Sequence, residues 1–284
     1  MTTTNKILLS LFLLFLVDGG RSHASDTISI DVAPDVATIV LGEQLRLDSS
    51  TLSEARKLNI YLPVSYESAA DKKYPVIYLL DGGADEDFIH IAGLVQFTSL
   101  PWLNFTPESI VVGIENVDRK RDFTSPSSDK RDQQEFPMAG GSRAFIDFLE
   151  NEVQPLVMSR YRTTGQRTLI GQSLGGLLAT EVLFTKPQLF DNYLIVSPSL
   201  WWDQERLLNE EIKVIAKAQP KVFVAVGDEG STMVRLATSL ADKLNHAYQS
   251  KDFSSYAYFD ELNHGDTLHL AAYHGLKSLF ANGE

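Results

Sequence analysis

Residues 167–175 read Arg-Thr-Leu-Ile-Gly-Gln-Ser-Leu-Gly, and this stretch decides the fold. The apolar run Thr168–Ile170 predicts a buried strand, and Leu174–Phe184 has the composition of a helix. Between them lies a turn that fits the pattern G-x-S-x-G, in which small glycines let a strand and a helix approach closely. The alternative is a glycine-rich turn whose serine only caps the helix.

The same alternation of strand and helix extends to both sides of this stretch. Solid apolar runs are typical of strands buried on both faces of a sheet, and they occur at Val76–Leu80, Ile110–Ile114, Tyr193–Val196, Val222–Val226 and Tyr256–Phe259. Helices are expected at Arg143–Tyr161, Leu174–Phe184, Thr232–Tyr248 and Thr267–Phe280. The alternating segments Glu43–Ser50 and Leu58–Leu62 predict two antiparallel strands. The fold class is therefore α/β, with a mostly parallel central sheet and helices on both faces.

Ser173 stands where the strand meets the helix, which is the setting of a nucleophile elbow. A serine nucleophile needs a base and an acid that orients the base, and after such an elbow they follow in the order serine, acid, histidine. Asp228 and Glu229 follow the strand Val222–Val226. We favour Glu229 as the acid, with Asp228, or no acid at all, as the alternatives.

Only one of the six histidines fits the position of the base. His264 lies in a loop after the last predicted strand and before the last predicted helix, and Gly265 follows it. The others lie in the first 24 residues, within or at the ends of predicted helices, or before the serine. We therefore predict His264 as the general base.

A serine nucleophile that attacks a carbonyl group also requires N–H groups, which stabilise the negatively charged oxygen of the resulting intermediate. One is expected from Leu174, because the first N–H groups of a helix have no partner within it. The other is expected from Gly83, in the loop Asp81-Gly82-Gly83 after the strand Val76–Leu80. The alternative is that these glycines form an ordinary turn.

Two long connections interrupt the alternation, and both follow sheet strands, so we expect them to border the site. Residues 116–140 contain Arg119, Lys120, Arg121, Lys130 and Arg131, and residues 198–219 contain Trp201 and Trp202. Arg119, Arg121, Trp201 and Trp202 are candidates for binding an anionic aromatic substrate. Alternatively, the basic side chains pair with neighbouring aspartates and the tryptophans pack in the interior or in a lid.

The first 24 residues predict a secretory signal peptide, with Lys6, the apolar run Ile7–Val17 and Ser22-His23-Ala24 before a cleavage site. The run is shorter than a membrane span requires, although an uncleaved anchor is the alternative. We expect a leader at 1–24, an N-terminal arm at 25–42, a catalytic domain at 43–284, and a periplasmic or secreted location.

Composition narrows the classes of partner. The net charge is −12 and no cysteine is present. These features argue against nucleic acid, which requires clustered basic residues, and exclude disulfides and thiolate metal sites. Without an H-E-x-x-H motif or another spaced ligand cluster, we predict no metal and no organic cofactor.

The stretch Thr168–Asp203, TLIGQSLGGLLATEVLFTKPQLFDNYLIVSPSLWWD, resembles the putative esterase family of α/β-hydrolases. Residues 58–66 (LNIYLPVSY), 75–83 (PVIYLLDGG), 121–126 (RDFTSP) and 140–157 (GGSRAFIDFLENEVQPLV) also resemble it. The similarity is greatest to the branch of siderophore esterases of the enterobactin, salmochelin and bacillibactin type.

This resemblance implies an α/β-hydrolase fold, hydrolysis of a small-molecule carboxylic ester, and catalytic roles for Ser173 and His264. The loop Gly227–Gly230 is about one residue shorter than the common form, which leaves the identity of the acid open. A non-catalytic binding protein on the same fold and an acyltransferase are the alternative functions.

Overall fold

The computed structural model describes residues 37–212, 219–250 and 253–281, and Val40–Glu284 form one compact unit. The predicted leader at 1–24 and most of the predicted arm at 25–42 lie outside the described residues. The strands are β1 (Gly42–Ser49), β2 (Glu54–Tyr61), β3 (Tyr74–Leu79), β4 (Ile110–Ile114), β5 (Thr163–Gln172), β6 (Asn192–Val196), β7 (Lys221–Gly227) and β8 (Ser254–Phe259).

Helices lie between most of the strands. They are α1 (Phe88–Thr98), α2 (Arg119–Asp122), α3 (Lys130–Glu135), α4 (Ser142–Phe148), a π-helical turn η1 (Leu149–Val153), α5 (Gln154–Arg160), α6 (Leu174–Thr185), a 3₁₀ turn η2 (Pro187–Leu189), α7 (Trp202–Asn209), α8 (Ser231–Ala247) and α9 (Thr267–Phe280).

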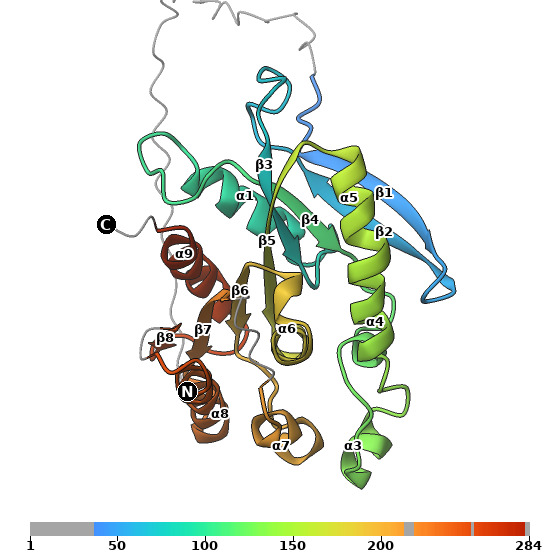
Figure 1. The fold of residues 1–284 in the computed structure, drawn as a ribbon, viewed down its shortest axis with the longest axis vertical. Coiled ribbons are helices and arrows are strands. Elements are labelled where there is room, and N and C mark those ends of the chain that lie inside the picture. Colours follow the sequence, from blue (N-terminus) through green and yellow to red (C-terminus); the bar gives the residue numbers. More distant parts are fainter. Residues whose placement is uncertain (1–36, 213–218, 251–252, 282–284) are drawn as a thin grey trace, which may run out of the picture. The chain divides into compact units, whose positions relative to one another are not determined.

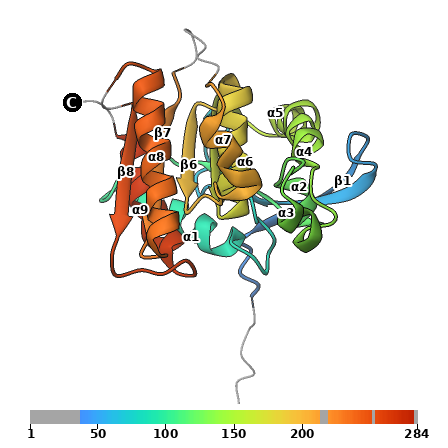
Figure 2. The ribbon, with the colours of Figure 1, turned by 90° about the horizontal axis from the view of Figure 1, so that it is seen from below.

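The strands form one sheet in the order β1-β2-β4-β3-β5-β6-β7-β8 (Figure 1). β1 pairs with β2, and β2 with β4, in antiparallel register, whereas every pair from β4 to β8 is parallel. Figure 2 shows β7, β8, α8 and α9 at one end of the sheet and β1 with α2–α5 at the other. The predicted fold class is confirmed.

Helices cover both faces of the sheet, which explains the unbroken apolar strands. Along β3, Val76 and Tyr78 pack on one face with α4, α5, α6 and α8, whereas Ile77 and Leu79 pack on the other with α1 and α9. Because neighbouring residues of a strand point to opposite faces, each of these positions must be apolar.

Two of the predicted elements differ in the structure. The helix expected at Arg143–Tyr161 widens into η1 between α4 and α5. Pro155, which follows, lacks the N–H that a regular helix would direct at residue 151. β8 lies at the sheet edge, and its Tyr256 and Tyr258 are exposed, so burial on both faces was wrong for this strand.

An ion network anchors the connection between β4 and α4 to the sheet. Arg56 of β2 is fully buried, and its Nη2 lies 2.5 Å from an oxygen of Asp122. Arg121 contacts both that aspartate and Glu54 of β2. Such pairs are stable only when each charge keeps its partner, so the network fixes where this connection leaves the sheet.

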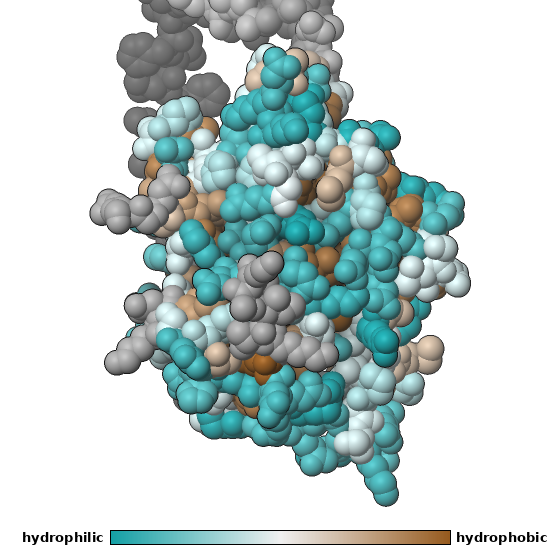
Figure 3. Space-filling model, viewed as in Figure 1, coloured by the Kyte–Doolittle hydropathy of each residue, from teal (hydrophilic) through white to brown (hydrophobic). Residues whose placement is uncertain are grey.

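The surface is mostly hydrophilic on the face shown in Figure 3, with apolar residues in small separate patches. Of the helices in the described ranges, none is both long and apolar enough to cross a membrane. On the face of the sheet covered by α1 and α9, His90 and His269 link these helices through ring nitrogens 2.8 Å apart.

Candidate active site

Ser173 occupies the turn between β5 and α6 with a strained backbone, at φ 58° and ψ −118°. A positive φ is unfavourable for a residue with a side chain. Its N–H donates to the carbonyl of Val196 at 3.0 Å, and its own carbonyl accepts from the N–H of Ser199 at 3.0 Å. These bonds fix the turn against the end of β6.

The glycines around this serine are required by close packing. A Cβ on Gly171 would lie 2.3 Å from the carbonyl oxygen of Gly175, and one on Gly176 would lie 2.9 Å from the carbonyl oxygen of Val196. Both separations are shorter than real Cβ contacts, so any larger residue would displace backbone. The turn thus has the backbone geometry that a nucleophile elbow requires.

Glu229 and His264, predicted as acid and base, are in direct contact. Glu229 Oε2 lies 2.5 Å from His264 Nδ1. The glutamate follows β7 and the histidine follows β8, so two parallel strands deliver them to the same edge of the sheet. The carboxylate is almost fully buried, whereas the imidazole is about half exposed, with 48% of its side chain accessible.

Hydrogen bonds hold the Glu229 carboxylate in its ionised form. Its Oε1 accepts from Ser197 Oγ, from the Gly227 N–H at 3.0 Å and from Thr267 Oγ1 at 3.3 Å. Burial alone would raise the pKa of Glu229, but the bonds from His264, Ser197 and Gly227 outweigh it and lower this pKa below its ordinary value. An ionised acid can accept from His264 Nδ1–H and leave Nε2 free as a base.

Gln172 connects the histidine loop to the elbow. Its Nε2 donates to the carbonyl of His264 at 2.7 Å, and it directly precedes Ser173. The hydroxyl of Ser173, however, faces Ser199 Oγ at 3.3 Å, and no hydrogen bond to His264 is among its contacts with the described residues. The structure therefore joins Glu229 directly to His264 and brings Gln172, but not the hydroxyl of Ser173, into contact with the His264 loop.

The predicted oxyanion loop lies beside the elbow, at the end of β3. Gly82 packs against Gly113 of β4 so closely that a Cβ would lie 2.3 Å from the Gly113 Cα, and Asn59 Nδ2 donates to its carbonyl. Leu174, the second predicted donor, is the first residue of α6, so its N–H has no acceptor within the helix. The N–H of Gly83 donates to Glu86 Oε2 at 2.6 Å.

Arg119 braces the oxyanion loop against the elbow. Its guanidinium makes two bonds to the Asp81 carboxylate, at 2.5 and 3.0 Å, and donates to the carbonyl of Gln172 at 3.1 Å. Arg119, predicted to bind substrate, thus has its charge paired with the carboxylate of Asp81.

Asp87 follows the same loop. Burial, together with the nearby carboxylates of Asp81 and Glu86, raises the pKa of Asp87 to about 6, and Arg119 opposes this rise.

The other basic residues of residues 116–140 are largely paired as well. Arg121 belongs to the ion network of β2, and Arg131 pairs with Asp129 at 2.9 Å. Lys120 lies over the ring of Phe136, 4.5 Å from its centroid. These contacts favour the alternative in which most of the cluster serves the structure and not a bound anion.

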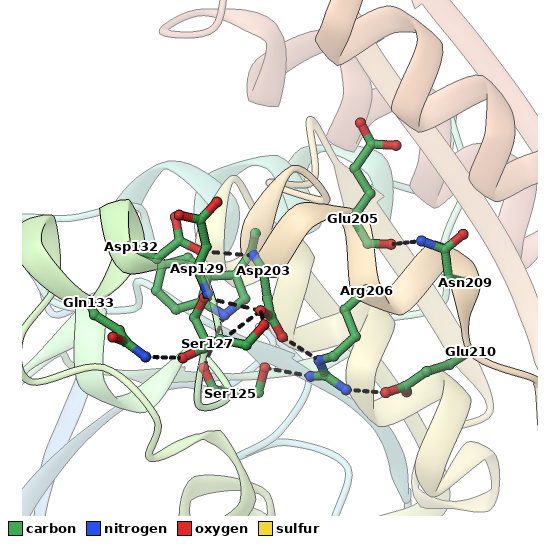
Figure 4. Close-up of polar contacts among 12 residues, drawn as sticks. Ser125, Ser127, Asp129, Asp132, Gln133, Asp203, Glu205, Arg206, Asn209 and Glu210 are labelled. Atoms are coloured by element: carbon green, nitrogen blue, oxygen red, sulfur yellow. Dashed lines mark hydrogen bonds and ion pairs between the residues drawn. The ribbon is translucent and has the colours of Figure 1, made fainter.

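The two tryptophans have different environments. Trp202 is buried, and its indole N–H donates to the carbonyl of Ser125 at 3.0 Å, whereas Trp201 is partly exposed and packs against Phe136. Asp203 accepts from Ser127, which joins the two long connections, and pairs with Arg206 (Figure 4). Trp202 is therefore a packing residue, and Trp201 keeps a surface that a ligand could contact.

Sequence reasoning missed several polar residues of the site. Ser197 and Thr267 form hydrogen bonds with Glu229, Ser199 with Ser173, and Gln172 with the His264 loop. The available signal was position, since each lies within three residues of a strand end or a helix start. Within the residues that the structure describes, no three histidine, aspartate or glutamate side chains cluster as metal ligands.

Residues 49–274 match the family described as "Putative esterase". The ferri-bacillibactin esterase BesA of Bacillus subtilis is 32% identical over 186 residues, covering 61% of this chain and 64% of that protein. The siderophore triacetylfusarinine C esterase of Aspergillus fumigatus is 33% identical over 186 residues, covering 59% and 61%. These alignments span less than two thirds of either relative.

Solved structures agree with this assignment. An IroE-like serine hydrolase from Shewanella oneidensis has a TM-score of 0.73 and 33% identity, covering 84% of this chain and 80% of that one. The BES protein from Bacillus cereus has a TM-score of 0.76 and 28% identity, covering 88% and 100%. Together with the strained serine turn and the contact between acid and histidine, the match over residues 49–274 shows that this chain belongs to the putative esterase family.

Proposed function

We propose that this protein is an exported serine esterase that hydrolyses carboxylic esters through Ser173, His264 and Glu229. The observation that carries the proposal is the 2.5 Å contact between Glu229 and His264. Gln172 links the loop of His264 to the strained turn of Ser173 through a hydrogen bond. The matching family and the named activities of the relatives support the same reaction.

In the proposed reaction, Ser173 Oγ attacks the ester carbon and its proton passes to His264 Nε2. The N–H groups of Gly83 and Leu174 stabilise the oxyanion. The carbon–oxygen bond of the ester then breaks, and the alcohol leaves with the proton from His264. Water, activated by the same imidazole, hydrolyses the acyl-enzyme and restores Ser173. The first step requires the Ser173 hydroxyl to turn from Ser199 towards His264.

We further propose an iron-siderophore ester as the substrate class. Two relatives are named for esters of this kind, one of them bacillibactin and the other triacetylfusarinine C. Trp201 has a partly exposed aromatic surface and lies two residues after Ser199, whose hydroxyl contacts that of Ser173. Because Arg119 and Arg121 are paired with carboxylates, the charge of the site does not by itself select an anionic complex.

Export remains a proposal supported by the sequence of residues 1–24, which has a basic start, an apolar run and small residues before a cleavage site.

Replacing Ser173 by alanine removes the nucleophile, so we expect kcat for a p-nitrophenyl ester to fall on the order of 10⁶-fold, towards the uncatalysed rate. The matched control is Ser199→Ala, which removes a hydroxyl 3.3 Å away and should reduce kcat less than tenfold. Ester turnover that survives in Ser173→Ala would refute the assignment of the nucleophile.

Replacing Glu229 by glutamine removes the charge that orients His264, and we expect kcat to fall roughly 10²- to 10⁴-fold at neutral pH. Because the pKa of this carboxyl is lower in the folded protein than in the unfolded chain, the carboxylate stabilises the fold above the ordinary glutamate pKa, and this contribution is lost as pH falls through the lowered value. The stability difference between wild type and variant, from urea unfolding, should therefore shrink below about pH 4. A difference that grows with acidity would contradict the assignment.

The substrate class is tested with three esters, which are p-nitrophenyl butyrate, an iron-loaded catecholate trilactone and an iron-loaded hydroxamate ester. We expect kcat/KM for at least one iron complex to exceed that for its iron-free form by roughly tenfold or more. Trp201→Ala should raise KM for the preferred complex roughly fivefold, with little effect on the butyrate. Equal kcat/KM for all iron-loaded and iron-free forms would exclude the siderophore proposal and leave the esterase proposal standing.

A further inference from the structure

The N–H group expected to stabilise the oxyanion is already occupied by a side chain of the protein. Gly83 N–H donates to Glu86 Oε2 at 2.6 Å, and the Glu86 N–H donates back to the Gly83 carbonyl at 3.0 Å. Gly83 is buried, whereas Glu86 is exposed to solvent. The carboxylate thus approaches the donor from the solvent side.

A second bond keeps this carboxylate in place. Asn116 Nδ2 donates to Glu86 Oε1 at 2.8 Å and to Asp81 Oδ1 at 2.7 Å. Both carboxylate oxygens of Glu86 therefore accept hydrogen bonds, one from the Gly83 N–H and the other from Asn116, which follows β4. Asp85 also lies close, since a Cβ on Gly83 would meet Glu86 Oε2 at 2.8 Å and Asp85 Oδ1 at 3.1 Å.

We propose that Glu86 is an internal, displaceable occupant of the oxyanion donor and a determinant of which esters are hydrolysed. This inference rests on the proposed esterase function. A bond from an N–H to a carboxylate is among the stronger hydrogen bonds in proteins, and the substrate carbonyl needs the same N–H. The ester must therefore displace Glu86 before Ser173 can attack.

This arrangement discriminates between substrates by their remote contacts. A large ester that binds elsewhere on the protein has binding energy available to displace a side chain, whereas a small ester does not. The displaced Glu86 also places negative charge beside the reacting carbonyl. Glu86 consequently disfavours small esters and acyl groups with negative charge close to the carbonyl.

The test uses Glu86→Ala and Glu86→Gln in the full chain, with Asp85→Ala as the matched control that removes the same charge without freeing the donor. Two readouts are measured: kcat/KM for p-nitrophenyl acetate, and the rate of inactivation by diethyl 4-nitrophenyl phosphate. In the inactivation, a bond forms between Ser173 Oγ and phosphorus, 4-nitrophenolate leaves, and the serine proton passes to His264. The phosphoryl oxygen needs the same N–H donors as the ester carbonyl.

We expect Glu86→Ala to raise both rate constants about tenfold, which is the loss of one charge-assisted hydrogen bond to be displaced. Glu86→Gln should give a smaller increase, because its amide oxygen still accepts from Gly83. Asp85→Ala should change both rates less than twofold. The increase should also be smaller for a large ester that the wild type hydrolyses efficiently.

Other outcomes overturn the inference. Lower rates in Glu86→Ala that Glu86→Gln restores would show that Glu86 only supports the loop, and equal increases in Glu86→Ala and Asp85→Ala would show a general effect of charge. If the wild type hydrolyses the ester and the Glu86 variants have the same two rate constants as the wild type, only this inference fails. If the wild type neither hydrolyses esters nor is labelled at Ser173, the proposed function fails and this inference with it.

Discussion

The strained backbone of Ser173 is the constraint on which the site depends. A positive φ at a residue with a side chain costs about 1–3 kcal/mol, and the turn keeps it through bonds to Val196 and Ser199. Gly171 and Gly176 allow α6 to approach the sheet closely enough for those bonds to form. Because these contacts reach the end of β6, the position of the serine is set by the parallel sheet itself. The chemistry proposed here therefore follows from strand pairing as much as from the identity of the serine.

Most charged side chains near the site form ion pairs or hydrogen bonds that fix segments of the chain relative to one another. Arg119 joins the Asp81 loop to the elbow, and Asp203 joins the two long connections. The same use of charge extends to Glu86, which accepts a hydrogen bond from the Gly83 N–H and, in our proposal, is displaced by the substrate. The basic substrate-binding cluster was predicted from residues close in sequence, but Arg119 pairs with Asp81 and Arg121 with Glu54, both distant in sequence, and Arg131 pairs with the nearby Asp129. Arg119 and Arg121 are paired with carboxylates. They therefore stabilise the loops around the site and do not act as free positive charges that bind an anion.

The fold could be predicted from sequence because the spacing of apolar residues and the length of each apolar run are local properties of the chain. The apolar runs predicted the parallel strands, and Ser173, Glu229 and His264 were predicted as site residues because each follows a strand at the edge where parallel strands end. Glu229 and His264 do meet in space. What could not be predicted depends on side-chain direction across the sheet: the turn of Ser173 towards Ser199, the capture of Gly83 by Glu86, and the pairing of Arg119. The edge position of β8 was missed because an apolar run does not reveal which strand lies at the edge of the sheet.

The central claim is that Ser173, His264 and the two N–H donors act on one reacting atom. A crystal structure of the protein after reaction with diethyl 4-nitrophenyl phosphate tests it most directly. The account predicts a single adduct on Ser173, with a phosphoryl oxygen about 3 Å from the N–H groups of Gly83 and Leu174, His264 Nε2 facing the serine oxygen, and Glu86 displaced. An adduct on another residue, or one on Ser173 with the His264 ring turned away and Gly83 still bound to Glu86, would contradict it.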